Sequence, residues 1–150
     1  MKLKLSISQE RYHAVKAALL EHGIEIDDNA DLVLSEANRF LDTLMVKSPA
    51  DSQRICLPVD EIISAESFGH TIEVYAKSGR YQARERLYQL ERQLDPQRFL
   101  RVSNSVIVAR SQIQRITPTL SMKFLLTMAD GRTVTVTRSY YHIFKEYFGI

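Results

Sequence analysis

The spacing of apolar and polar residues changes character along the first part of the chain. Residues 2–7 alternate between polar and apolar, which is typical of a half-buried strand. Tyr12, Val15 and Leu19 then recur at i, i+3 and i+7, which places them on one face of a helix. Ser8 is a favourable residue for the start of this helix, and Gly23 stands where helices commonly end.

Two short strands are predicted after the helix, over residues 24–26 and 31–37, around a DDNA turn. With the preceding elements they form a predicted β-α-β-β unit over residues 1–40. A unit of this size buries little apolar surface by itself. We therefore expect it to pack on the rest of the chain or on a second copy. The predicted boundary lies between Asn38 and Val46.

Strand patterns dominate the remaining residues, 41–150. One helix is predicted inside this region, because Ala83, Leu87, Leu90 and Leu94 form an apolar stripe that Asp95-Pro96 ends. Pro58 falls in a strand-like run, which indicates an edge strand or a bulge. The strand-like runs are ICLPV, EIISAES, TIEVYA and RYQA.

A β-hairpin is predicted near the end of the chain, and its register follows from burial. A three-residue loop, 129–131, sets 128 opposite 132, 126 opposite 134 and 124 opposite 136. This register places on one face Phe124, Leu126, Met128, Val134 and Val136. It also places Gly131 at the position that needs a positive φ.

A terminal helix is predicted to pack on the sheet through Tyr140, Ile143, Phe144 and Tyr147, which have helical spacing. The expected fold class is therefore mostly β, α+β overall. It has one internal and one C-terminal helix.

Charge is distributed unevenly along the chain, although the formal net charge is only +2. Residues 98–150 contain eight Lys and Arg against two Asp and Glu, a net charge of +6, whereas residues 1–46 carry −3. A basic region of this kind favours an acidic partner, and nucleic acid is the commonest one.

Sequence motifs for catalysis and for cofactors are absent. The four histidines, at positions 13, 22, 70 and 142, do not have metal-ligand spacing, and Cys56 is the single cysteine. Glycine-rich phosphate loops and the GxSxG motif do not occur. We therefore expect no enzyme, no cofactor and no metal. The chain also lacks an apolar run long enough for a membrane span, so we expect a cytoplasmic protein without membrane insertion.

Four segments in register resemble the LytTR family of bacterial DNA-binding domains. They are ICLPVDEIISAESFGHTIEVYAKSGRY, ARERLYQLERQL, RFLRVSNSVIVARSQIQRI and the hairpin ending TVTVTRSYY. The resemblance runs from about Leu44 to Ile150 and does not cover residues 1–40, so the DNA-binding domain is placed at residues 41–150. Each motif is weak alone, but four in the same order and spacing are specific.

The resemblance implies an elongated stack of small antiparallel sheets. It also implies a stand-alone transcriptional regulator without a receiver domain. Loops at the sheet edges would enter successive major grooves of double-stranded DNA. Such domains bind paired repeats, which implies a homodimer. The unit over residues 1–40 would then serve dimerisation or receive a signal from a protein partner.

Three residues match positions at which the family contacts bases: His70, Asn104 and Arg138. Arginine pairs with guanine and asparagine with adenine through two hydrogen bonds each. Without the family, His70 reads as a loop histidine, Asn104 as a turn residue and Arg138 as a side chain that covers apolar surface.

Residues near these three are candidates for contacts with the DNA backbone, which fix the position of a protein on the duplex without reading its sequence. They are Arg101, Ser103, Ser105, Lys123, Arg132, Thr137, Ser139 and Lys145. The alternative function is a protein-interaction module whose basic surface binds an acidic protein.

Overall fold

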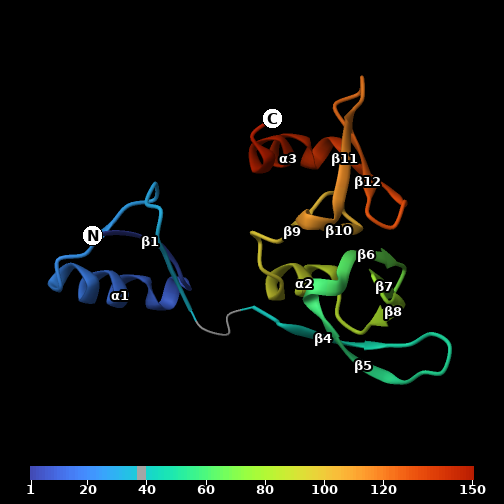
Figure 1. Cartoon of the computed structure of the whole chain (residues 1–150), viewed down its shortest axis with the longest axis horizontal. Coiled ribbons are helices and arrows are strands. Elements are labelled where there is room, and N and C mark those ends of the chain that lie inside the picture. The colour runs from blue at the N-terminus through green and yellow to red at the C-terminus, as the bar shows by residue number, and fades with distance from the viewer. Residues whose placement is uncertain (37–39) are drawn as a thin grey trace. The chain divides into compact units, whose positions relative to one another are not determined.

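The computed structural model describes residues 1–36 and 40–150, and the chain divides into two compact units, Met1–Arg39 and Phe40–Ile150 (Figure 1). Each unit is described by itself. Ala37, the last residue of a predicted strand, and Asn38, where the predicted boundary begins, lie outside the described residues.

The first unit contains the four predicted elements, with shorter strands than the sequence pattern suggested. The elements are β1 (Lys2–Ser6), α1 (Gln9–Glu21), β2 (Glu25–Ile26) and β3 (Val33–Ser35). The sheet order is β2-β1-β3, and both outer strands run parallel to β1. The strands on either side of the DDNA turn therefore do not pair with each other.

Helix α1 has the expected ends and the expected face. Ser8 precedes its first residue, although the Ser8 side chain makes no capping hydrogen bond, and Gly23 follows its end with a φ of +78°. Tyr12, Val15 and Leu19 are the half-buried positions of the helix, and its other side chains are exposed. The described part of this unit has one buried apolar side chain, Leu5. The expectation of a small buried surface is thus met.

The second unit contains two antiparallel sheets and two α-helices, α2 (Leu87–Gln93) and α3 (Tyr141–Phe148). The larger sheet has the order β5 (Arg54–Pro58), β4 (Thr43–Lys47), β8 (Gly79–Ala83), β7 (Thr71–Ala76), β6 (Ile62–Phe68), β10 (Val106–Ala109), β9 (Phe99–Arg101). The smaller sheet has the order β11 (Ile113–Pro118), β12 (Phe124–Met128), β13 (Thr133–Val136). Short 3₁₀ turns lie at Val59–Glu61, Arg110–Gln112 and Arg138–Tyr140. Pro58 lies on β5, an edge strand, as its position in the sequence indicated.

Strand β10 lies between two hydrophobic cores, because its alternate side chains point to opposite faces of the sheet. Ile107 and Ala109 pack in the first core, which contains α2. Val106 and Val108 pack in the second core, with the smaller sheet and α3. Figure 1 shows β9 and β10 between these two groups of elements. The mostly β fold with stacked antiparallel sheets is confirmed.

The predicted hairpin register is confirmed. Phe124 pairs with Val136 and Leu126 with Val134, and the five apolar side chains of this face are all buried. The Met128 amide donates to the Arg132 carbonyl oxygen at 2.8 Å, and Gly131 has a φ of +84°. The three-residue loop follows from the burial of this face.

Two residues of the predicted helical stripes have other roles. Ala83 is the last residue of strand β8 rather than part of the helix, although it is buried in the first core. Ile143 is 60% exposed, so its predicted packing contact is wrong. The other three predicted residues do pack against the second core: Phe144 is buried, and Tyr140 and Tyr147 are half-buried, together with Tyr141 and Phe148. The docking face of the helix is therefore rotated away from Ile143.

A pair of neighbouring leucines tests the second core. Leu126 is fully buried, whereas Leu125 is on the opposite face of β12 and is 38% exposed. We expect Leu126→Ala to lower the free energy of unfolding by about 2–5 kcal/mol, because it leaves a cavity. Leu125→Ala should lower it by less than about 1 kcal/mol. Urea unfolding of both variants measures the difference, and equal losses would contradict the assigned register.

Candidate nucleic-acid interface

Three exposed segments carry the residues predicted to contact bases. His70 follows Gly69 in the tight turn between β6 and β7, where Gly69 has a φ of +60°. Asn104 lies in the loop between β9 and β10, and Arg138 begins the 3₁₀ turn after β13. The side chains of all three residues are exposed, so the fold leaves them available to a partner.

Hydrogen bonds join these segments, although they are far apart in the sequence. The Thr137 amide donates to the Val102 carbonyl oxygen at 3.0 Å. The Tyr140 hydroxyl donates to Asn104 Oδ1 at 3.3 Å, so the Asn104 and Arg138 segments lie side by side.

The turn that carries His70 begins next to the same loop. The Ser67 amide donates to the Ser105 carbonyl oxygen at 2.8 Å, three residues before His70. The three segments therefore follow one edge of the unit.

An open polar groove of about 530 Å³ lies where the β9–β10 loop meets β13. Hydroxyl groups dominate its wall. The lining residues are Glu66, Ser103, Asn104, Ser105, Val106, Thr133, Val134, Thr135, Thr137 and Ser139. Hydroxyl groups both donate and accept hydrogen bonds, so this wall can meet phosphate oxygens and base edges alike.

Some lining residues were missed in the sequence analysis. Thr133 and Thr135 could have been found, because they alternate with the buried valines of β13 and therefore face away from the core. The residues around Glu66 in the sequence do not predict its place in the groove, because Glu66 lies there only through the pairing of β6 with β10.

Arg101 holds the β9–β10 loop in place. Its Nε atom donates to the Ser103 carbonyl oxygen at 3.0 Å, and one terminal nitrogen donates to the Asn104 carbonyl oxygen at 2.6 Å. The other terminal nitrogen is 3.0 Å from Glu91 Oε1, in an ion pair. Ser103 adds to this order, because its buried hydroxyl oxygen accepts a hydrogen bond from the Ser105 amide at 3.2 Å.

Arg132 also has protein partners. Its guanidinium group lies over the Tyr75 ring, 3.3 Å from the centroid, and pairs with Glu66 at 3.2 Å. These contacts join the smaller sheet to β6 and β7. Phosphate contacts by Arg101 and Arg132 remain predictions, and both guanidinium groups already bind protein atoms.

The cationic group of Lys145 is 5.6 Å from the centroid of the Tyr141 ring on α3. Arg138 takes part in none of the ion pairs found among residues 1–36 and 40–150. Its charge is therefore open to a partner.

The described residues offer neither a metal site nor a membrane-spanning helix. Within them, no group of three His, Cys, Asp or Glu side chains is arranged to hold a metal ion. None of the helices in the described ranges has the length and apolar character needed to cross a membrane.

Comparison with protein families identifies the second unit. The model of the LytTr DNA-binding domain matches residues 52–149, about two thirds of the chain. The chain belongs to the LytTR family of DNA-binding domains. A solved LytTr DNA-binding domain from Bacillus cereus has a TM-score of 0.69 and 26% sequence identity, and the match covers 73% of this chain and 99% of that one.

Relatives in Staphylococcus aureus match more of the chain. An uncharacterised HTH-type transcriptional regulator of strain NCTC 8325 is 23% identical over 125 residues, which is 83% of this chain and 84% of the relative. Another, of strain MSSA476, is 22% identical over 146 residues, 97% of both chains. In the LytTR chain described here, strands separate α1, α2 and α3 from one another. A helix-turn-helix motif instead joins two helices directly.

Replacement of Arg101 by lysine tests how the loop is held. Lysine is a point charge and cannot supply donors in the geometry of a guanidinium group. We expect Arg101→Lys to lower the free energy of unfolding by about 1–3 kcal/mol and to speed hydrogen exchange of the Ser105 amide. Arg115→Lys, at an exposed position of β11, is the matched control and should change neither quantity. If the Ser105 amide of Arg101→Lys exchanges at the wild-type rate, Arg101 does not hold the β9–β10 loop in place.

Proposed function

We propose that this DNA-binding transcriptional regulator of the LytTR family reads duplex DNA in the major groove, through the edge formed by its three loop segments. One observation carries the proposal: backbone hydrogen bonds bring the β9–β10 loop together with the segments that precede His70 and Arg138. A polar groove lined by hydroxyl groups lies at the same place. The net charge of +6 in residues 98–150 supports a polyanionic partner.

Base recognition is assigned to Arg138, Asn104 and His70. The exposed Arg138 guanidinium has the donor geometry for the O6 and N7 atoms of guanine. The Asn104 amide suits the N6 and N7 atoms of adenine, and Tyr140 restrains its oxygen. His70 can donate a hydrogen bond to a base or to a phosphate from the β6–β7 turn.

Contacts with the DNA backbone are assigned to side chains around these three. The candidates are Ser105, Lys123, Thr137, Ser139 and Lys145. Arg101, Ser103 and Arg132 would act mainly by holding the loop and the two sheets in position, since they already bind protein atoms. A duplex DNA partner also implies the bacterial cytoplasm as the site of action.

A homodimer is proposed through the edge strand β3 of the first unit. Its apolar residues are exposed, including Val33 at 48%. The Lys4 amide donates to the Leu32 carbonyl oxygen, and Lys4 is in register with Val33. In a parallel pair, the Val33 backbone amide and carbonyl then point to the free edge, where a second copy can add a strand. A signalling protein is the alternative occupant of this edge.

Replacement of Arg138 tests base recognition. We expect Arg138→Ala to weaken binding to the preferred duplex by about 1–3 kcal/mol and to relax the preference at one base pair. Binding-site selection from random duplexes identifies the preferred sequence, and fluorescence anisotropy measures the affinities. Sequence preference that survives the substitution unchanged would rule out this role for Arg138.

Lys145→Ala is the comparison for Arg138→Ala. It should weaken binding to all duplexes about equally and lower the slope of log K against log salt by about 0.9, as loss of one phosphate contact does. The two variants therefore separate reading of the sequence from attraction to the backbone.

A charge on the edge strand tests the dimer. We expect Val33→Lys in the full chain to convert the dimer to a monomer, because a lysine on a sheet edge opposes pairing with another strand. Leu120→Lys, on a fully exposed residue of the second unit, is the matched control and should leave the dimer intact. Sedimentation velocity reads the mass. A Val33→Lys protein that stays dimeric would show that β3 is not the interface.

A further inference from the structure

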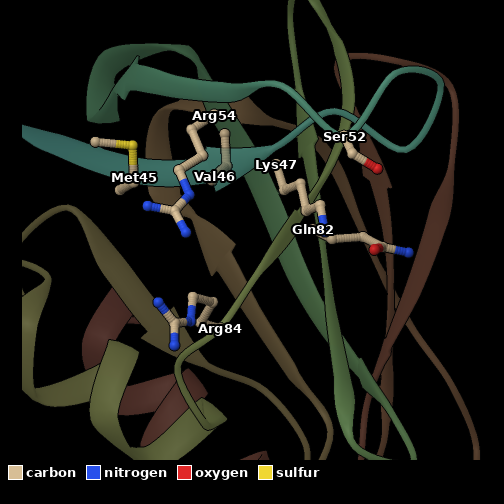
Figure 2. Close-up of a pocket in the computed structure, with 7 residues that line it drawn as sticks. All are labelled: Met45, Val46, Lys47, Ser52, Arg54, Gln82 and Arg84. Carbon is tan, nitrogen blue, oxygen red and sulfur yellow. The ribbon is translucent and has the colours of Figure 1, made fainter.

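A second concentration of positive charge lies on the larger sheet, away from the polar groove. Lys47, Arg54 and Arg84 line an open pocket of about 420 Å³. The other lining residues are Met45, Val46, Ser52 and Gln82, and none of them is acidic. Figure 2 shows the Arg54 side chain extending toward Arg84 across this basic pocket, and Lys47 lies beside Gln82.

The basic pocket is lined by three cations and by no acidic side chain. Lys47 is directly opposite Arg54 in the register of β4 and β5, an arrangement that is destabilising by itself. None of the three cations is in an ion pair found within residues 1–36 and 40–150.

The buried carboxylate of Glu73, on the next strand, already has partners. It accepts hydrogen bonds from Arg80 at 2.9 Å and from Gln82 at 3.3 Å. The contact with Glu73 also raises the pKa of Arg80. Glu73 is thus committed to other donors, and it is not among the residues that line the basic pocket.

The position of the basic pocket in the sheet connects it with the proposed DNA-reading edge. Ala83, at the end of β8, pairs with Ile72, which is two residues after His70. Arg84 therefore follows β8 at the end of the sheet where His70 precedes β7. Strand β4 is separated from β7 only by β8, a distance of about 10 Å between strand axes.

We propose that Lys47, Arg54 and Arg84 bind phosphates of the same duplex that the His70 turn approaches. This inference rests on the proposed function and extends its contact surface beyond the basic C-terminal third of the chain. The three cations would bind the backbone and would not read sequence. The DNA is favoured over an acidic protein because the basic pocket continues the edge on which the base-reading segments lie.

The test compares two double variants of the full chain. Lys47→Gln with Arg54→Gln removes two charges from the basic pocket and relieves their repulsion, so the protein should stay folded. Lys77→Gln with Arg92→Gln removes two charges elsewhere. Lys77 lies in the β7–β8 turn, at the opposite end of β7 from His70, and Arg92 lies on α2. The thermal unfolding midpoint confirms that each variant is folded.

Binding of a labelled random-sequence duplex is measured by anisotropy over a range of salt concentrations. We expect the basic-pocket variant to lower the slope of log K against log salt by about 2, since each phosphate contact contributes about 0.9. Arg84→Gln alone should lower it by about 0.9. The control variant should keep the wild-type slope, and the sequence preference should be unchanged in all three variants.

The outcomes separate this inference from the proposed function. A wild-type slope in the basic-pocket variant overturns the inference and leaves DNA binding intact. An equally large decrease in the slope of log K against log salt in the control variant also overturns the inference, because the change in net charge alone would then explain the result. Failure of the wild-type protein to bind any duplex overturns both.

Discussion

The second unit depends on the burial of strand β10 on both faces. Val106 and Val108 belong to one core, Ile107 and Ala109 to the other, and all four are buried. A shift of one residue in the pairing of β10 would exchange the side chains between the cores, so both cores specify the same register. The loop that precedes β10 is therefore fixed in space by packing on two sides.

Hydrogen bonds also hold the β9–β10 loop, which lines the polar groove, in a fixed position. The carbonyl oxygens of Val102, Ser103 and Asn104 all accept hydrogen bonds, from Thr137 and from Arg101. All three acceptors are backbone atoms and the side-chain donor in two of the bonds is Arg101, so the shape of the loop depends little on the side chains that face outward. Residues such as Asn104 can therefore differ between proteins of the same fold without a change in the scaffold. The scaffold therefore sets where a side chain is presented to a partner.

The sequence predicted those features that depend on local periodicity. The register of the hairpin at Phe124 and Val136 followed from which face had to be buried, and the ends of α1 followed from Ser8 and Gly23. Features that depend on contacts between distant segments were not predictable in this way. Glu66 lines the groove only because β6 pairs with β10, and the basic pocket exists only because β4 pairs with β8 as well as with β5. Ile143 failed as a core residue because helical spacing alone does not say which of two adjacent faces meets the sheet.

The order of strands in the first unit affects when it can form during synthesis. Strand β1 precedes the other elements of this unit in the sequence and is also its central strand, with β2 and β3 on its two sides. It leaves the ribosome with both edges unpaired, and its second neighbour is complete only at Ser35. Removal of the first few residues would take away the middle of this sheet, so β2 and β3 would lose their shared partner. Strand β1 is thus the structural centre of the first unit, although it precedes both of its neighbours in the sequence.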